Sequence, residues 1–389
     1  MGTVIVSQSR TPFGRFRGTL SHYSAIDLGR MSIESALRKV ALNGSQIDEV
    51  IFGCVLQANL GQAPVKQLAL ASGIEPSAGC TAVNKVCGSG LKSVMLADAS
   101  IRAGDCDVAV VGGMESMSNA PHYLNGYRAG KKMGNGQLID GMLHDGLVDP
   151  FHRVSMGVLA DRYAERFELE RVRLDQFAEL SYERSLAAYK NGHYADDIIK
   201  IDNDETSLAR DEELNRFRKS AMAQLKPVFN KDGVVTVGNA SKINDGACAL
   251  VVMEESRAQK LGLKPLARIV AQATYGGRSE DFPIAPAGAI GKVLEKSNLL
   301  LEEIELFEIN EAFAMVPLAV QDKLGISESS VNPLGGAISL GHPIGASGAR
   351  VLMNLVRGLK VFQKRYGCAS VCLGGGEAVA MIVENGGLM

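Results

Sequence analysis

Two residues of this chain have types and surroundings suited to covalent chemistry on a small substrate. Cys87 lies between an extended run and a predicted helix, and Gly88 and Gly90 leave its sulfur accessible. Free amide N–H groups and the dipole at a helix start stabilise a thiolate, so the position favours a nucleophile. Neutral imidazole accepts a thiol proton at neutral pH, which makes His342, in a Gly- and Pro-rich turn, the natural partner. The alternatives are a buried core thiol for Cys87 and an ordinary core or surface histidine for His342.

Further positions could act on a developing negative charge. Cys372 ends an apolar run just before Gly374–Gly376, whose amide N–H groups are not shielded by side chains and can point at an oxyanion. Asn310 and Glu311 end a second apolar run, where a polar pair is costly unless it caps a helix or holds a water. For Cys372 and Asn310, simple burial and helix capping are the respective alternatives.

One rival site is a phosphate-binding loop. The segment GSGLKS at 88–93 resembles a truncated GxGxxG motif, which would indicate a nucleotide-binding Rossmann-type oxidoreductase. Ser93 replaces the third glycine, and Asp105 and Asp107 precede the next strand instead of ending it. The motif is therefore the weaker reading of this segment.

The elements that position these residues alternate between strands and helices. Apolar spacing predicts a helix over 25–40, buried strands over 49–55 and 108–113, and a helix after Cys87. Phe52 and Phe307 are 255 positions apart, and so are Cys87 and His342. We therefore predict a duplicated α/β fold in which Cys87 and His342 occupy equivalent helix starts that face each other.

A change of character interrupts this duplication. The stretch from about 117 to 243 is loop-like and then rich in charged residues at helical spacing. We predict three parts: residues 1–116 with 244–265 as the N-terminal half, 117–243 as an inserted loop domain, and 266–389 as the C-terminal half.

Composition excludes several classes of protein. A formal charge of −2 over 389 residues gives no field to gather nucleic acid or anionic membrane, and no apolar run is long enough to cross a bilayer. Seven dispersed cysteines without a CxxC pair predict reduced thiols, and no metal-ligand cluster is visible. With no recognisable targeting segment, we expect a cytoplasmic protein that binds neither nucleic acid nor membrane.

Five motifs are specific when taken together: NKVCGSG, NASKINDGA, NEAFA, GGAISLGHPIGASGAR and CLGGGEA, in this order between 84 and 378. With them the chain resembles the thiolase family, of the acetyl-CoA C-acetyltransferase type. The resemblance implies two similar five-layered α/β/α/β/α halves with an inserted loop domain. It implies condensation of two acetyl-CoA to acetoacetyl-CoA and coenzyme A, or the reverse thiolysis, without a further cofactor.

The resemblance also implies roles for individual residues. Cys87 would be acylated, His342 would activate it, and Cys372 would exchange a proton with the second substrate. Asn310 would hold a water that, with His342, binds the thioester oxygen, and the amides of Cys87 and Gly374 would form a second oxyanion hole. The positions that match coenzyme A contacts in the family are Ser241, Ala240, Phe229, Met156, Ala312 and Phe313.

The chain departs from the family pattern at several positions. Ser155 stands where many members have histidine, Lys66 where arginine is usual, and Lys242 where glycine is usual. Glu377, in GGGEA, would place a carboxylate near Cys372 and favour its protonated form. These departures leave the reaction type in place and affect substrate length and pH behaviour.

Alternatives within the fold remain open. A broader-chain 3-ketoacyl-CoA thiolase, a β-ketoacyl synthase and a hydroxymethylglutaryl-CoA synthase are rival readings, and Cys372 favours a thiolase. We expect Phe282 and Pro283 to narrow the acyl end of the pocket and so to favour acetoacetyl-CoA. The cations Arg216, Arg218 and Lys219 could attract the 3′-phosphate of coenzyme A, unless they form a solvated face. We expect a homodimer or homotetramer.

Overall fold

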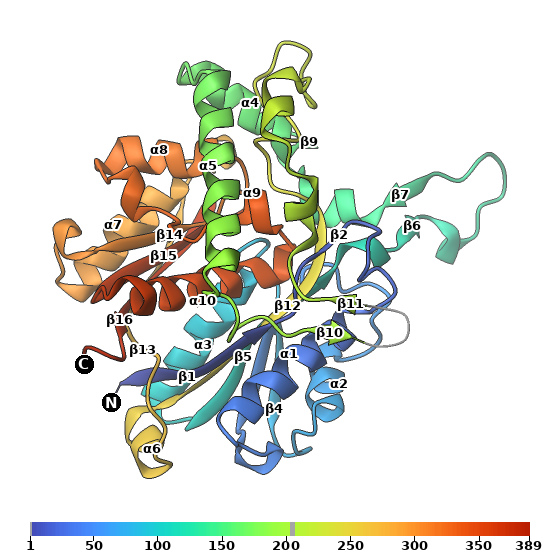
Figure 1. The fold of residues 1–389 in the computed structure, drawn as a ribbon. Helices are drawn as coiled ribbons and strands as arrows, with labels where there is room; N and C mark the ends of the chain where they lie inside the picture. Colours follow the sequence, from blue (N-terminus) through green and yellow to red (C-terminus); the bar gives the residue numbers. More distant parts are fainter. Residues whose placement is uncertain (1, 203–206) are drawn as a thin grey trace.

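A long mixed β-sheet runs through the computed structural model, which describes residues 2–202 and 207–389 (Figure 1). Its strands follow the order β14-β15-β16-β13-β1-β12-β5-β3-β4, and β2 pairs with β12. The bounds of these strands are β1 Thr3–Arg10, β2 Gly14–Arg15, β3 Glu49–Gly53, β4 Gly79–Val83, β5 Val108–Ser116, β12 Asn244–Glu254, β13 Ala267–Gly276, β14 Leu306–Ile309, β15 Tyr366–Cys372 and β16 Glu377–Asn385.

The strand order is symmetric about the β1–β13 pair. On one side β3 and β5 are parallel and β12 is antiparallel to β5; on the other, β14 and β15 are parallel and β16 is antiparallel to β15. The two halves meet where Thr3, Val4 and Ile5 pair with Ile269, Arg268 and Ala267. The predicted duplication is therefore present, and β4 is an extra edge strand of the N-terminal half.

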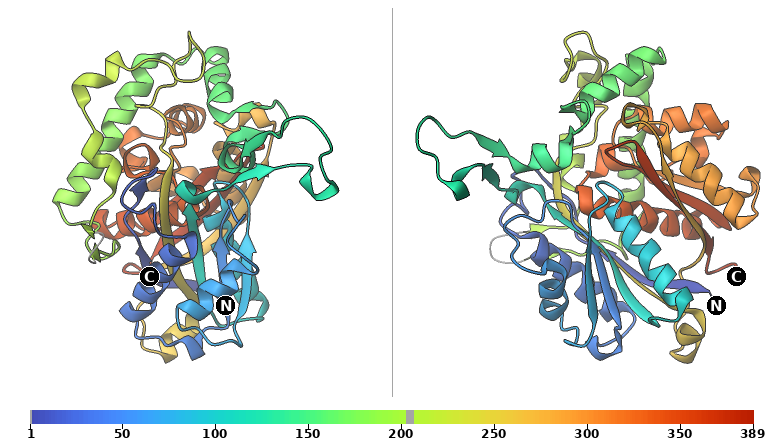
Figure 2. Two further views of the ribbon diagram at one scale, coloured as in Figure 1. Left: turned by 90° about the vertical axis from the view of Figure 1, so that its right-hand side faces the viewer. Right: turned by 180° about the vertical axis from the view of Figure 1, so that it is seen from behind.

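Helices form three layers around this sheet. Helices α1 and α2 pack on the outer face of the N-terminal strands, α7 and α8 on the outer face of the C-terminal strands, and α3 and α10 lie in the core between them (Figures 1 and 2). Along β1, Val4 and Val6 face the outer layer and Ile5 the central one, as alternation along a strand requires. The arrangement is the predicted five-layered α/β fold.

Ten α-helices are defined in the described residues: α1 Ala25–Lys39, α2 Pro64–Ala71, α3 Ser89–Ala103, α4 Met156–Arg166, α5 Arg171–Lys190, α6 Glu255–Lys260, α7 Ala285–Ser297, α8 Met315–Leu324, α9 Ala337–Leu340 and α10 Ile344–Phe362. The helix expected over 25–40 and the strands expected over 49–55 and 108–113 are confirmed to within a few residues. Within the described ranges, none of the helices has both the length and the apolar character that crossing a bilayer requires.

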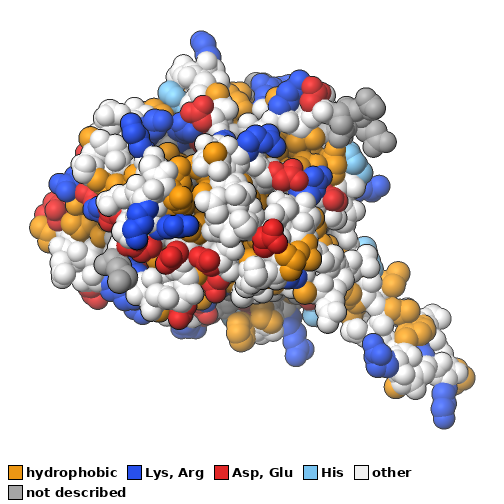
Figure 3. All heavy atoms as spheres, turned by 90° about the horizontal axis from the view of Figure 1, so that it is seen from below, with side chains coloured by type: hydrophobic (Ala, Val, Ile, Leu, Met, Phe, Trp, Pro, Cys, Tyr) orange, Lys and Arg blue, Asp and Glu red, His pale blue; other side chains and the backbone are white. Residues whose placement is uncertain are grey.

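The chain between the neighbouring strands β5 and β12 leaves the sheet. It carries α4 and α5 and three short ribbons, β6–β7 (His122–Leu124, Leu138–Asp140), β8–β9 (Val148–Asp149, Val154–Ser155) and β10–β11 (Ile201–Asp202, Ser207–Leu208). The β6–β7 hairpin projects from the body as an arm, visible at the lower right of Figure 3. Its exposed apolar side chains are Leu124, Tyr127, Met133 and Leu138.

Candidate active site

Cys87 and His342 occupy the same position at two helix starts. Helix α3 follows its N-cap Gly88, and α10 follows its N-cap Pro343, so each candidate residue lies directly before a cap. The residues before them, Val86 and Gly341, also 255 positions apart, have positive φ values of 45° and 111°. A β-branched residue rarely adopts such a φ, and strain of this kind costs on the order of 1–3 kcal/mol. The backbone therefore turns sharply into both candidate residues.

The two helix starts cross at glycines, one on each helix. A Cβ atom on Gly90 would lie 3.0 Å from the carbonyl oxygen of Gly345 and 2.7 Å from the backbone nitrogen of Ala349. On Gly348 it would lie 2.4 Å from the backbone nitrogen of Leu91. Main chain meets main chain at this crossing, which brings Cys87 and His342 to one region, and Gly90 of GSGLKS serves helix packing.

Hydrogen bonds fix the tautomer of His342. Ser347 Oγ donates its single proton to the Pro343 carbonyl (2.8 Å), so it accepts from His342 Nδ1–H at 2.6 Å. His342 Nε2 then carries the lone pair, and it is buried with no hydrogen-bond partner within residues 2–202 and 207–389. Burial, with a contribution from the Arg350 cation, lowers the pKa of His342 to about 3. The imidazole is therefore neutral: Nε2 is free to accept a proton, and the hydrogen bond from Nδ1–H to Ser347 Oγ orients the ring.

Cys87 is a thiol at rest. The residue is partly exposed, but its sulfur is surrounded by protein, and this desolvation raises the pKa of Cys87 to about 12. The amide N–H groups of Cys87 and Gly374 point at the sulfur and only partly oppose the shift. The helix start stabilises the thiolate as expected, but burial has the larger effect on the pKa of Cys87. Reaction therefore requires a base.

Cys372 is 1 % exposed at the end of β15. Burial raises its pKa above the usual range, and the neighbouring Cys87 adds to this effect. Glu377, expected beside Cys372, instead forms an ion pair with Lys85, and its side chain is 42 % exposed. Among the causes that shift the pKa of Cys372 are burial and Cys87, and Glu377 is not one of them.

Asn310 lies fully buried just beyond β14. Its amide oxygen accepts from Arg350 Nη2 at 2.8 Å, whereas its Nδ2 is buried without a partner in the described chain. The N-cap of the following helix α8 is Ala314, so the helix-capping alternative for Asn310 is wrong. The amide has two free N–H donors.

Most of the residues matched to coenzyme A contacts belong to two adjacent segments, 239–241 and 312–314, and to Phe229, which packs on Phe313; we call these together the wall. Residues 239–241 run beside 312–314: the Ser241 amide donates to the Ala312 carbonyl (3.0 Å), and Ala240 forms a β-bridge with Phe313. Phe313 has edge contacts with Phe229 (centroids 6.4 Å apart) and Phe282 (6.0 Å apart). The wall thus reaches the residue expected to limit the acyl chain.

Helix α4 begins against the same wall. Met156 is its first residue, and a Cβ atom on Gly157 would lie 2.1 Å from the Phe229 ring. Ser155, at the place of the family histidine, is the N-cap residue of α4 and makes no side-chain cap bond. The glycine is therefore required for Phe229 to lie on this helix start.

The two lysines that depart from the family pattern, Lys242 and Lys66, both donate hydrogen bonds to backbone carbonyls. Lys242 donates to the Ala240 carbonyl at 2.6 Å, and burial of the ammonium lowers its pKa to about 8. Lys66 donates to the carbonyls of Pro76 and Ala78 at 2.6 and 2.9 Å, which fastens a turn to α2.

The basic cluster of the insertion is exposed. Lys219 pairs with Glu183 (2.7 Å) and Glu179 (3.4 Å) on α5, and Arg218 donates to the carbonyls of Asn215 and Phe217. Arg216 is exposed as well. A role of the cluster in binding the 3′-phosphate stays a prediction.

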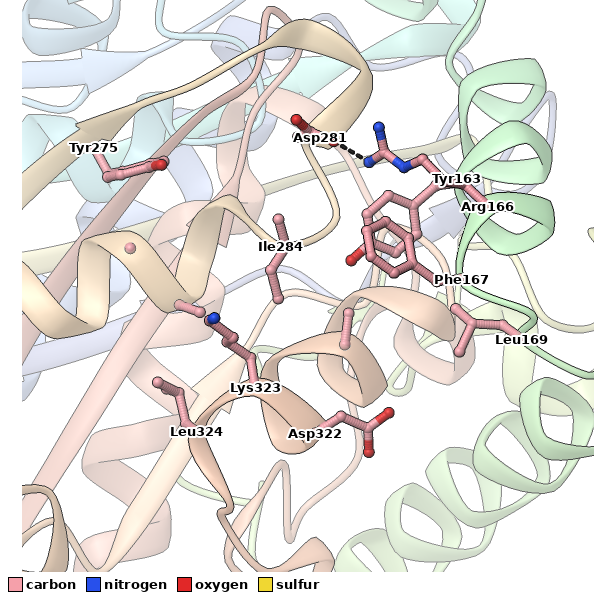
Figure 4. A pocket seen from close by; sticks show the side chains of 13 residues that line it. Tyr163, Arg166, Phe167, Leu169, Tyr275, Asp281, Ile284, Asp322, Lys323 and Leu324 are labelled. Carbon is pink, nitrogen blue, oxygen red and sulfur yellow. Dashed lines mark hydrogen bonds and ion pairs between the residues drawn. The ribbon is translucent and has the colours of Figure 1, made fainter.

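A cavity of about 850 Å³ lies between α4, β13, α7 and α8 (Figure 4). Aromatic rings of Tyr163, Phe167 and Tyr275 line it, and an ion pair joins Arg166 to Asp281 at its edge. Its lining does not include the candidate catalytic residues. Asp281 and Ile284, which flank Phe282–Pro283 in the sequence, line this cavity, and the buried Phe282 itself packs on Phe313.

Three supporting residues were not anticipated from the sequence. Ser347 orients His342, and Asn244 Oδ1 accepts from the His342 amide at 2.9 Å. Buried Glu115 accepts from the amides of Val55, Leu56 and Gly345, at 3.0, 3.0 and 2.8 Å, and ties the start of α10 to the N-terminal half. Ser347 and Asn244 belong to motifs that were recognised, so a polar residue close to a candidate base was the available signal.

Comparisons with known proteins agree with this arrangement. Residues 3–256 match the family description "Thiolase, N-terminal domain" and residues 263–385 match "Thiolase, C-terminal domain". Acetyl-CoA acetyltransferase 2 of Arabidopsis thaliana is 45% identical, covering 98% of this chain and 96% of its own length. Acetyl-CoA acetyltransferase of Escherichia coli is 44% identical, with 98% of each chain covered.

A solved structure extends the likeness to three dimensions. The Acat5 thiolase of Ascaris suum, crystallised in complex with coenzyme A, superposes with a TM-score of 0.94 at 38% identity, over 99% of this chain and 100% of that one. The alternative of a Rossmann-type oxidoreductase is therefore wrong. These matches cover nearly the whole chain, and we conclude that it belongs to the thiolase family.

Proposed function

We propose that this thiolase-family enzyme interconverts acetoacetyl-CoA plus coenzyme A with two acetyl-CoA by a ping-pong mechanism through acetyl-Cys87. The observation that carries the proposal is that the Gly374 amide points at the Cys87 sulfur. At the neighbouring start of α10, His342 Nε2 is buried and has no hydrogen-bond partner among the described residues. The names of the Arabidopsis and Escherichia coli relatives support acetyl-CoA as the substrate.

In the thiolysis direction, His342 Nε2 takes the Cys87 proton while the sulfur attacks the C3 carbonyl of acetoacetyl-CoA. The oxyanion receives hydrogen bonds from the amides of Cys87 and Gly374, a kind of contact whose removal typically costs 10²–10³-fold in rate. The C2–C3 bond then breaks, which leaves acetyl-Cys87 and the enolate of acetyl-CoA. Imidazolium His342 and a water held by Asn310 would stabilise the enolate oxygen.

Cys372 completes the proton balance. Its thiol donates a proton to C2 of the enolate, and acetyl-CoA departs. Coenzyme A then gives its thiol proton to the Cys372 thiolate, its sulfur attacks acetyl-Cys87, and the released Cys87 sulfur recovers its proton from His342. The raised pKa of Cys372 suits this role, because the residue begins the cycle protonated. Condensation is the same sequence in reverse.

Acetoacetyl-CoA is the substrate we expect to react best. Phe282 is 1 % exposed and packs on Phe313 at the wall that matches the coenzyme A contacts. A broader-chain 3-ketoacyl-CoA thiolase is the second candidate, favoured by the cavity beside Phe282. Equal or greater kcat/KM for a ketoacyl chain of eight or more carbons, measured by thiolysis, would favour that candidate instead.

The direct test combines acetylation and proton exchange. Brief incubation with acetyl-CoA, a quench and peptide mass mapping should find the acetyl group on Cys87 and on no other cysteine. Cys372→Ala should still be acetylated, while deuterium exchange at the acetyl methyl of acetyl-CoA falls by about 10²–10⁴-fold. An acetyl group elsewhere, or exchange at wild-type speed in the variant, contradicts the assigned roles.

We further propose a cytoplasmic homodimer or homotetramer that needs no cofactor beyond its coenzyme A substrates. Two features support self-association: β4 lies at the sheet edge with mostly exposed residues, and the β6–β7 arm projects apolar side chains into solvent. Light scattering at micromolar concentration should give a multiple of the 41.4 kDa chain mass. A single monomeric species contradicts this proposal.

A further inference from the structure

Arg350 is a fully buried cation behind the candidate site. It lies on α10, two turns beyond the helix start that follows His342, and its side chain is 0 % exposed. Its Nη2 donates to Asn310 Oδ1 at 2.8 Å. Burial of an arginine is costly unless its charge and donors are matched, so a particular arrangement must compensate for it.

Glu308 supplies the opposite charge. Its carboxylate, 1 % exposed on β14, lies 3.7 Å from Arg350 Nη1 and two residues before Asn310. Burial raises the pKa of Glu308 well above its usual range, and Arg350 opposes this shift. Arg350 also acts to lower the pKa of Cys248 on β12, of Tyr194 and of His342. One guanidinium therefore acts on both the strand that carries Asn310 and the ring of His342.

The chemistry of the two side chains decides how the amide faces. An asparagine amide can present its oxygen or its NH₂ group in a given direction, whereas arginine has donors only. With Arg350 on one side, Asn310 must turn its oxygen toward Arg350 and its NH₂ group away. That NH₂ group is the buried donor left without a partner in the described residues.

We propose that Arg350 is a positioning residue: it fixes the Asn310 amide with its NH₂ group turned away from Arg350, where it holds the water that binds the thioester oxygen of the second substrate. This inference rests on the proposed function. It assigns Arg350 to the enolate half of the reaction, because Asn310 serves the thioester oxygen whereas the amides of Cys87 and Gly374 serve the acyl group on Cys87.

The test uses the full-length enzyme and two rates, acetylation of Cys87 in a single turnover and deuterium exchange at the methyl of acetyl-CoA. The main variant is Arg350→Met combined with Glu308→Gln, which removes both buried charges together. Arg350→Lys keeps the charge but loses the planar fork. Arg357→Met, on the same helix, is the matched control, because it breaks an ion pair with Asp197 (2.7 Å) that does not touch the site.

We expect the double variant to lose up to about 100-fold in exchange relative to acetylation, the size of effect that a misplaced group produces. Arg350→Lys should lose less, and Arg357→Met should keep the wild-type ratio. Without the cation the pKa of His342 rises, so the acid limb of the acetylation rate moves to higher pH in the double variant only.

An exchange-to-acetylation ratio equal to wild type in the folded double variant overturns the inference. If that variant does not fold, Arg350→Lys decides, and an unchanged ratio there overturns it equally. Failure of the proposed function is a different result: the wild-type enzyme itself would then show neither acetyl-Cys87 nor exchange.

Discussion

Replacing Ser347 by alanine tests whether His342 acts through an oriented Nε2 lone pair. In the structure, Ser347 Oγ is the acceptor for His342 Nδ1–H at 2.6 Å. The Pro343 carbonyl, to which Ser347 donates, also accepts from the amides of Ala346 (3.0 Å) and Ser347 (2.9 Å). The substitution therefore removes the support of the imidazole and leaves the carbonyl satisfied.

The size of the effect follows from one hydrogen bond. A neutral hydrogen bond contributes about 0.5–1.5 kcal/mol net, and about 1.4 kcal/mol corresponds to a tenfold change in rate. If the lost bond appears wholly in the transition state, Ser347→Ala slows acetylation of Cys87 by about 2-fold to 10-fold. A forced wrong tautomer would cost far more, but alanine imposes neither tautomer.

The assay is single-turnover acetylation of Cys87 by acetyl-CoA, followed by mass spectrometry. Ser32→Ala is the matched control: Ser32 is also fully buried in a helix and donates to the Gly29 carbonyl at 2.7 Å, far along the chain from the site. Control and wild type should react at the same rate. A Ser347→Ala rate indistinguishable from both would refute the assigned tautomer.

Two other changes have expected outcomes. Phe282→Ala should open the site toward the 850 Å³ cavity and raise kcat/KM for long 3-ketoacyl-CoA relative to acetoacetyl-CoA, at a stability cost of about 3–5 kcal/mol; an unchanged ratio contradicts the role of Phe282. Burial raises the pKa of Glu115 to about 7 from its usual 4.5, so the folded state retains a proton that the unfolded state loses, and the free energy of unfolding should fall as pH rises between these values. In urea titrations, the free energy of unfolding of Glu115→Gln should not fall in this way between pH 5 and pH 8. An equal fall in the wild type and the variant would contradict the assignment of this pH dependence to Glu115.

The duplication could be predicted because equivalent residues of the two halves are separated by a constant number of positions in the sequence. The offset shared by Phe52 with Phe307 and by Cys87 with His342 predicted two equivalent helix starts, and the structure places both residues directly before an N-cap. The 3.6-residue spacing of apolar residues was sufficient to predict α1, and a continuous apolar run was sufficient to predict β5, whose nine residues are all buried. The implied catalytic and coenzyme A roles came from resemblance and remain proposals.

Other features depend on contacts that spacing does not encode. The positive φ of Val86 contradicts its intrinsic preference and is imposed by the surrounding fold. Glu377 forms an ion pair with Lys85, 292 positions away in the sequence, so the GGGEA motif alone could not show that Glu377 is not among the groups that shift the pKa of Cys372. The resting state of Cys87 likewise depends on how completely the sulfur is desolvated, which local sequence does not specify.

The symmetric order of the sheet strands has a consequence for how unlike chemical groups come to share one site. If each half were a separate chain and the two identical copies paired, any residue chosen at one helix start would appear at the other as well. A thiol would then face a thiol, or an imidazole an imidazole. Joining the copies in one chain lets each position change alone, so a cysteine at 87 and a histidine at 342 can occupy the two equivalent helix starts of a nearly symmetric frame.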